Sequence, residues 1–233
     1  IFSTLAEIHD IKLSLFFNLR LSKDDTNIEI ELSANSINNN KGDIIKVNLN
    51  KGQIYNVFGR KTSSVGNTHK GEDLTGTKIR SVATATSPCK RIGVFSGSSK
   101  ISITCDANSG SADNYMQQAF PANAWGKKYL TTPTRDMPNN FFRVAVSKPS
   151  AVVKRNGVVL TGLINNFYYE FQTNSADLIE SNEPIMVAQY ISTANKCGNT
   201  AIGGNGDPEM IYLSPIEQTI DKVTINSTPN AKI

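Results

Sequence analysis

Three cysteines and two histidines are the residues best suited to metal or redox chemistry: Cys89, Cys105, Cys197, His9 and His69. No two cysteines form a C-x-x-C pair, and both histidines are distant in sequence from every cysteine. A structural zinc site needs clustered ligands, so this spacing argues against zinc. We therefore expect no metal or other cofactor, and the cysteines point to a disulfide instead.

Cys89 and Cys105 flank the segment RIGVFSGSSKISIT, which is typical of a hairpin that turns near Gly97. In that register the two cysteines face one another across the hairpin, as a disulfide requires. We predict a Cys89–Cys105 disulfide, with buried free thiols as the alternative. Cys197 is then either free or paired outside this chain.

The sequence holds no catalytic signature that we can assign. Ser96 lies in Gly93–Gly97, one position late for the G-x-S-x-G turn of a hydrolase, and inside a predicted strand. Neither histidine has a triad context. Glycosidase chemistry needs paired carboxylates, but five glutamates stand among strands and turns without such a pattern: Glu170, Glu180, Glu183, Glu209 and Glu217. We expect no enzyme.

Two kinds of residue could bind a ligand. Trp125, the sole tryptophan, and Tyr115 are the aromatic candidates for ligand contact, and local packing is the alternative for Trp125. Asp207 and Glu209 could bind calcium together with loop carbonyls, although the spacing of an EF-hand is absent. Asp207 recurs as Asp113 in an internal repeat, which favours a structural role for both.

Composition bounds the remaining choices. The chain has 233 residues, which suffices for one large domain or two small ones. Its net charge of +4 is scattered, whereas nucleic-acid binding needs clustered basic residues. No stretch approaches the ~20 apolar residues of a membrane span, so we expect no membrane insertion. The chain starts without Met and without the pattern of a signal peptide, which indicates a mature chain or a fragment of a longer protein.

Short apolar segments with a period of two predict an all-β chain. Asn, Ser and Thr make up about 28% of the residues, which suits short strands joined by polar turns. One helix of about two turns is predicted within 113–125, limited by Pro121. The expected strands are 17–22, 27–33, 43–49, 53–58, 91–96, 100–105, 141–147, 151–155, 167–171 and 184–190.

An internal repeat divides the chain. The pattern D-x-x-M-x4-P begins at Asp113 and again at Asp207, an offset of 94. The segment KKYLT (127–131) matches DKVTI (221–225) at the same offset. Further matches pair Leu19 with Val144, Tyr55 with Tyr169, Ile79 with Ile179, Val94 with Val187 and Cys105 with Cys197. We predict a first β repeat over 1–140 and a second over 141–233.

The repeat length favours two tandem antiparallel β-sandwich-like units, because each repeat holds enough short strands for two sheets. A β-propeller-like assembly of short four-stranded sheets is the alternative. Residues 1–16 match neither copy well. One interpretation is that they complete a sheet begun upstream, which predicts an unpaired strand edge in the isolated chain.

Several phrases resemble the N-terminal domain family of the IgGFc-binding protein. They are GEDLTGTKIRS (71–81), CKRIGVFSGS (89–98), SADNYMQQAFPANAWGKKYL (111–130) and, in the second copy, VVLTGLINNFYYEF (158–171) and GDPEMIYLSPIEQ (206–218). The resemblance covers roughly residues 20–225. The chain departs from the family at Asn166, where glycine is usual, and in an insert near 58–71.

The resemblance implies an extracellular, non-enzymatic module. The amino-acid sequences of these segments are similar to those of the bacterial branch of the family, which is found in large cell-surface adhesins. The leading hypothesis is therefore a cell-surface binding module that recognises a glycan, mucin or protein and contacts neighbouring domains of the same polypeptide. The second hypothesis is a structural spacer in a long adhesin, and the third is an unrecognised carbohydrate-active enzyme.

Overall fold

A computed structural model of the chain describes residues 15–21, 23–65, 68–105, 112–135, 137–198 and 206–222. The described residues form antiparallel strands and two one-turn 3₁₀ helices, so the all-β prediction is confirmed. The first nine strands are β1 (Leu15–Leu21), β2 (Thr26–Glu31), β3 (Ile44–Leu49), β4 (Ile54–Phe58), β5 (Lys61–Val65), β6 (Thr68–Gly71), β7 (Lys78–Val82), β8 (Ile92–Ile101) and β9 (Asp113–Gln118). The remaining elements are η1 (Ala122–Ala124), β10 (Gly126–Thr131), β11 (Asn140–Val146), β12 (Val153–Arg155), β13 (Val158–Val159), β14 (Tyr168–Thr173), β15 (Asp177–Ile191), β16 (Glu209–Tyr212) and η3 (Ile216–Gln218).

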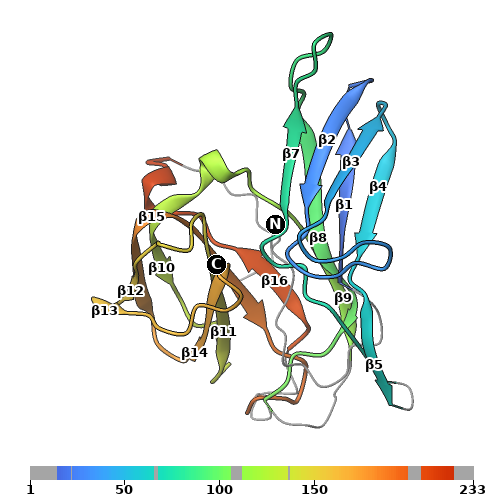
Figure 1. The fold of residues 1–233 in the computed structure, drawn as a ribbon. Coiled ribbons are helices and arrows are strands. Elements are labelled where there is room, and N and C mark those ends of the chain that lie inside the picture. Colours follow the sequence, from blue (N-terminus) through green and yellow to red (C-terminus); the bar gives the residue numbers. More distant parts are fainter. Residues whose placement is uncertain are drawn as a thin grey trace.

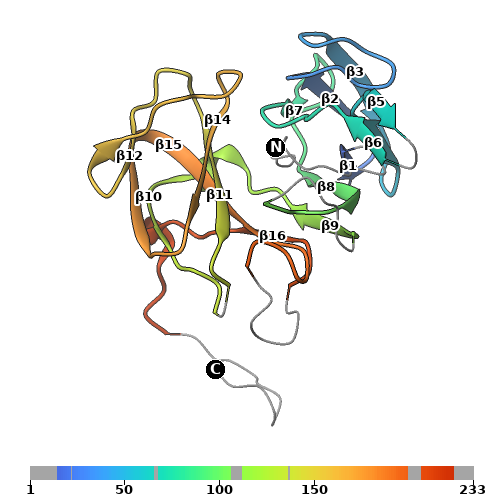
Figure 2. The same ribbon diagram turned by 90° about the horizontal axis from the view of Figure 1, so that it is seen from below.

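The strands gather into two groups that lie side by side (Figure 1 and Figure 2). Strands β1–β9 form the first half, with sheets of order β4-β1-β8-β9 and β3-β2-β7 and a separate β5-β6 hairpin. Strands β10–β16 form the second half, a single seven-stranded sheet organised around the long strand β15. β16 lies at the border between the halves, next to β9 (Figure 1).

The two halves use the same strand order and register. The order β4-β1-β8-β9 has its counterpart in β14-β11-β15-β16, where β15 contributes its C-terminal part. In the first half Leu19 pairs with Tyr55 and with Val94. The residues matched to these three in the sequence pair in the same way in the second half: Val144, Tyr169 and Val187.

The N-terminal part of β15 pairs with β10, a strand from an earlier segment of the chain. β10 pairs antiparallel with β15, so that Tyr129 lies opposite Ile179 and Thr131 opposite Asp177. The sheet boundary therefore falls before Gly126, although the sequence repeat places the division of the chain at residue 140. The last strand of the first repeat thus completes the sheet of the second half.

Three clusters of buried side chains form the core. One lies in the first half around Ile28 and Ile30, which alternate with polar residues along β2. A second fills the second half around Val144 and Ile179. The third lies at the junction and combines side chains of both halves, among them Ile101, Tyr115, Tyr190 and Tyr212. Along β2 the period of two reports one buried face correctly, whereas β11 is buried at every residue from Asn140 to Val146.

Two sequence predictions of local structure are wrong. The segment 113–125 forms strand β9 and the single turn η1 instead of a helix of two turns. Pairing of β9 with β8 outweighs its weak strand propensity, because it buries Tyr115 in the junction core. The segment 91–105 does not turn at Gly97: β8 runs unbroken from Ile92 to Ile101, and Gly97 lies opposite Met116 on β9.

Of residues 1–16, which the sequence associates with an upstream sheet, 1–14 lie outside the described residues. β1 begins at Leu15 and pairs with β4 and β8 of this same chain. Among the described strands, β7 pairs with β2 alone. The described part of the chain therefore has a strand edge at β7 that its own described strands leave open.

Candidate functional site

The junction between the halves contains a buried ionic cluster centred on Arg143, whose side chain is 0% exposed. Arg143 lies on β11, and its Nη1 donates to Asp73 Oδ2 and Thr75 Oγ1, each at 2.9 Å. Its Nε and Nη2 donate to Glu170 Oε2 on β14, at 3.2 and 2.8 Å. Asp73 and Thr75 belong to the 72–77 loop of the first half, so the guanidinium ties this loop to the second half.

The charge of Arg143 is stabilised by its surroundings. Burial alone would lower the pKa of the guanidinium, but the facing Asp73 carboxylate, together with Tyr190, Tyr168 and Glu170, raises that pKa above its usual value. The guanidinium also stacks over the ring of Tyr168, with its carbon 4.0 Å from the ring centroid. These contacts of the cation therefore join the two halves.

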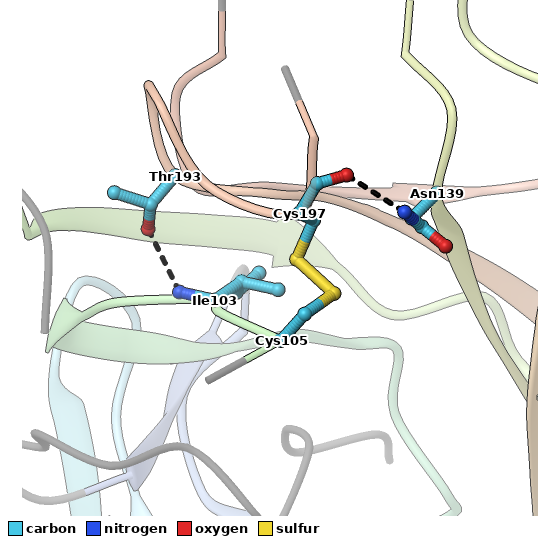
Figure 3. Close-up of a disulfide and its surroundings, with 5 residues drawn as sticks. All are labelled: Ile103, Cys105, Asn139, Thr193 and Cys197. Atoms are coloured by element: carbon cyan, nitrogen blue, oxygen red, sulfur yellow. Dashed lines mark hydrogen bonds between the residues drawn. A yellow bond between two sulfur atoms is a disulfide. The ribbon is translucent and has the colours of Figure 1, made fainter. Parts of the chain in front are cut away.

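The disulfide joins Cys105 to Cys197, with the Cα atoms 5.0 Å apart (Figure 3). Cys105 follows β8 of the first half, and Cys197 follows β15 of the second. Around the disulfide, Ile103 N donates to Thr193 Oγ1 at 2.8 Å and Asn139 Nδ2 donates to the Cys197 carbonyl at 2.7 Å (Figure 3). The bond is therefore a covalent link across the junction.

This pairing corrects the predicted Cys89–Cys105 disulfide. Because β8 continues through Gly97 without a hairpin, Cys89 and Cys105 lie beyond opposite ends of one strand and do not face one another. Cys89 is a free, exposed cysteine. The sequence contained a signal for this pairing, since Cys105 and Cys197 occupy matching positions of the predicted repeat.

The two aromatic candidates have different environments. Tyr115 is only 3% exposed and packs in the junction core beside Tyr190, so it is a core residue and not a surface contact. Trp125 is half-buried against the same core and its Nε1 donates to the Phe120 carbonyl at 3.3 Å. The ring of Phe120 is 36% exposed and lies 5.9 Å from that of Tyr212.

Phe120 and Trp125 flank the η1 turn, and we refer to residues 120–125 as the η1 surface. This surface rests on the matching turn of the second half, because Gln218 Nε2 donates to the Ala124 carbonyl at 2.7 Å. Lys127 N donates to Glu217 Oε1 at 2.8 Å, and Gly126 lies so close to Pro215 that no side chain would fit there. The η1 surface thus combines the half-buried Trp125 with the partly exposed Phe120 on a tightly packed base, and sequence reasoning identified only Trp125 of it.

The electrostatics of this base are also structural. Burial would raise the pKa of the Glu217 carboxyl, but hydrogen bonds from the backbone of residue 217 itself and of Lys127 and Lys128 lower that pKa below its usual value. The carboxylate is therefore ionised and held in place at neutral pH. It orients η3 against β10 beneath the η1 surface.

The remaining sequence candidates make structural contacts. Ser96 is buried in β8 and its Oγ lies 2.8 Å from Tyr212 Oη, a hydrogen bond across the junction. Glu170 binds Arg143, while Glu180 pairs with Lys128 and Glu183 with Lys148 on the surface. Each of these three carboxylates thus has a basic partner.

The calcium candidates lie at the start of β16: Asp207 precedes the strand, and Glu209 is its first residue. Asp207 is exposed, and Glu209 Oε1 accepts from Met210 N at 2.9 Å. Residues 199–205, which would have to supply loop carbonyls, lie outside the described residues. Among the residues that are described, no three His, Cys, Asp or Glu side chains gather as metal ligands would.

Comparison with known proteins gives one match. A family model with the description IgGFc binding protein matches residues 13–232. No curated protein and no solved structure matches the chain. Within the described ranges, no helix has the length and apolar character needed to cross a membrane.

Proposed function

The chain belongs to the IgGFc-binding protein family, and on this basis we propose that it is an extracellular binding module that recognises a glycoprotein through the η1 surface. The family suggests an extracellular binding domain and is not a known enzyme family. The disulfide fits this setting, because disulfides persist in oxidising compartments. The ligand and the attachment to a bacterial cell surface are part of the proposal.

The observation that carries the proposal is the placement of Phe120 and Trp125 on a locked junction. A half-buried tryptophan together with a partly exposed phenylalanine supplies contact area at a low entropic cost, provided that their base is rigid. The base here is held by the Arg143 cluster, by the Cys105–Cys197 disulfide and by the contacts of Gln218. Surface segments on a rigid scaffold are the usual location of binding residues.

We also propose that the module is a tandem repeat that functions as a single unit. The matching register of the two four-stranded groups supports a duplication. The turns η1 and η3 support it as well: both follow a proline, with φ and ψ of −65° and 152° at Pro121 and −69° and 154° at Pro215. The duplicated halves then share one junction instead of acting as independent domains.

The assignment to a large bacterial surface adhesin rests on the amino-acid sequence of segments such as CKRIGVFSGSSKISITC (89–105). Such a protein would place this module among neighbouring domains of the same polypeptide. Recognition of a glycan, a mucin or another protein then gives attachment. A module that binds nothing would act as a spacer.

The test is a binding screen of the purified chain against arrayed glycans, mucins and immunoglobulin Fc, at low and high salt. We expect binding to one class that persists at high salt, because contact through aromatic side chains is little screened. Trp125→Ala and Phe120→Ala should weaken this binding. Phe58→Ala is the matched control, since Phe58 is also 36% exposed but lies on β4 of the first half.

A further inference from the structure

The edge of β7 differs from the edge of its counterpart in the second half. Ile30 on β2 pairs with Ile79 on β7, and Arg155 on β12 pairs with Ile179 on β15 in the same way. The far side of Ile179 pairs with Tyr129 of β10. The far side of β7 has no partner among the described strands.

Burial reflects this difference. Ile179 lies between its two neighbouring strands and is 0% exposed, whereas the matching Ile79 is only half-buried. Tyr129 adds a hydrogen bond of 2.7 Å from its hydroxyl to the Ile185 carbonyl, which secures β10 against β15. The first half lacks the equivalent of this strand among its described residues, so β7 presents backbone donors and acceptors and part of an apolar side chain.

The charge at the edge is reversed between the halves. Lys128 of β10 lies opposite Glu180 and pairs with it at 3.1 Å. The residue matched to Glu180 on β7 is Arg80, whose side chain is largely exposed and pairs on its other side with Glu29. Lys78, also exposed, pairs with Glu31 at 3.2 Å on the same side as Glu29.

We propose that the edge of β7 binds an extended strand of a neighbouring module, antiparallel and in the register that β10 adopts on β15. The incoming strand places an aromatic or branched apolar residue opposite Ile79 and a carboxylate opposite Arg80. Within this chain β10, which lies in the predicted first repeat, already pairs with β15, so strand addition at β7 would repeat a pairing that exists in the structure. This edge is separate from the η1 surface and does not depend on the ligand bound there.

The test uses two peptides with the sequence of residues 126–132, GKKYLTT and its Lys128→Glu form, and measures their binding to the intact chain. We expect the Lys128→Glu peptide to bind about two- to fivefold more tightly at low salt, as an exposed ion pair contributes. Arg80→Glu in the chain should reverse the preference. Lys154→Glu on β12 is the matched control and should leave the preference unchanged.

Hydrogen exchange locates the peptide. Binding should protect the amides of residues 78–82. A preference for the unmodified peptide, with altered exchange at residues 177–180, would mean displacement of β10 and would overturn the proposal. Absence of binding, or binding without protection of β7, would overturn it too, and equal affinities of the two peptides would overturn the carboxylate assignment.

Discussion

Arg143 on β11 donates to Asp73, seventy residues earlier in the chain, across a distance of 2.9 Å with the guanidinium fully buried. This contact joins the D-L-T-G-T segment (73–77) of the first half to the core of the second half. It accounts for the presence of a charged pair inside an apolar junction: the pair fixes one relative placement of the halves.

Replacing Arg143 should be among the most destabilising single changes in the chain. Arg143→Ala leaves the carboxylates of Asp73 and Glu170 without their buried partner, and breaking such a pair costs about 3–5 kcal/mol. Urea denaturation followed by circular dichroism measures the change. Arg80→Ala is the control. The Arg80 side chain in the Arg80–Glu29 ion pair is largely exposed, so loss of this pair should change stability little. Similar losses for both variants would contradict a locked junction.

The disulfide prediction concerns both pairing and stability. Peptide mapping without reduction should recover Cys105 linked to Cys197, with Cys89 reacting with a thiol reagent in the native chain. Cys105→Ser with Cys197→Ser should lower the free energy of unfolding by roughly 2–5 kcal/mol, because the bond closes a long loop. Cys89→Ser should have no such effect. A Cys89–Cys105 peptide would contradict the structure.

The tyrosine that holds β10 should make stability fall at alkaline pH. Burial raises the pKa of Tyr129 to about 12, against about 10 in the unfolded chain. Below pH 10 the hydroxyl is protonated in both states. Between pH 10 and 12 the unfolded chain releases its proton first, so the free energy of unfolding falls as pH rises.

Tyr129→Phe tests this assignment. The variant should be less stable by about 1–3 kcal/mol at pH 7, because the Ile185 carbonyl and the Gly126 amide lose their partner. It should also lose stability less steeply between pH 10 and 12 than the parent chain. Other buried tyrosines with raised pKa, such as Tyr168, contribute equally to both proteins. Identical slopes would show that Tyr129 is not the group responsible.

A glycine in the 72–77 loop should be intolerant of any side chain. Gly76 has φ of +92°, and a Cβ there would overlap the ring of Phe167. Gly42 has a similar φ of +85° with open space around it, so Gly42→Ala measures the conformational cost alone. Thermal unfolding should show that Gly76→Ala costs about 1–3 kcal/mol more than Gly42→Ala, the typical penalty for overpacking. Equal costs would mean that the loop does not pack against the second half.

The sequence predicted the class of fold because strands of one buried face leave a period of two. Ile28 and Ile30 on β2 are an example. It also contained the matches, such as Leu19 with Val144, whose strand pairings have the same register. Asn166, a departure from the glycine usual in the family, fits the same turn, because it adopts φ of +65° and Asn tolerates that conformation better than most residues.

The contacts across the junction could not be predicted in this way. Asp73 and Arg143 carry no local pattern that relates them, and neither does the pair Ser96 and Tyr212. The predicted Cys89–Cys105 disulfide is wrong because it depends on a turn at Gly97. This glycine instead lies where β8 and β9 approach closely, since a Cβ on Gly97 would meet the Tyr115 backbone. Long-range pairing decides such cases, and a single sequence contains it only where a repeat makes it visible.

The binding function is best decided by repeating the binding screen with three proteins: the parent chain, Trp125→Ala and Phe58→Ala. We expect salt-resistant binding to one ligand class by the parent chain and by Phe58→Ala, with at least a tenfold loss in Trp125→Ala, as for an aromatic anchor. Binding that Trp125→Ala leaves intact would contradict the η1 surface as the site. No binding by the parent chain to any glycan, mucin or Fc would contradict the binding function and favour a spacer.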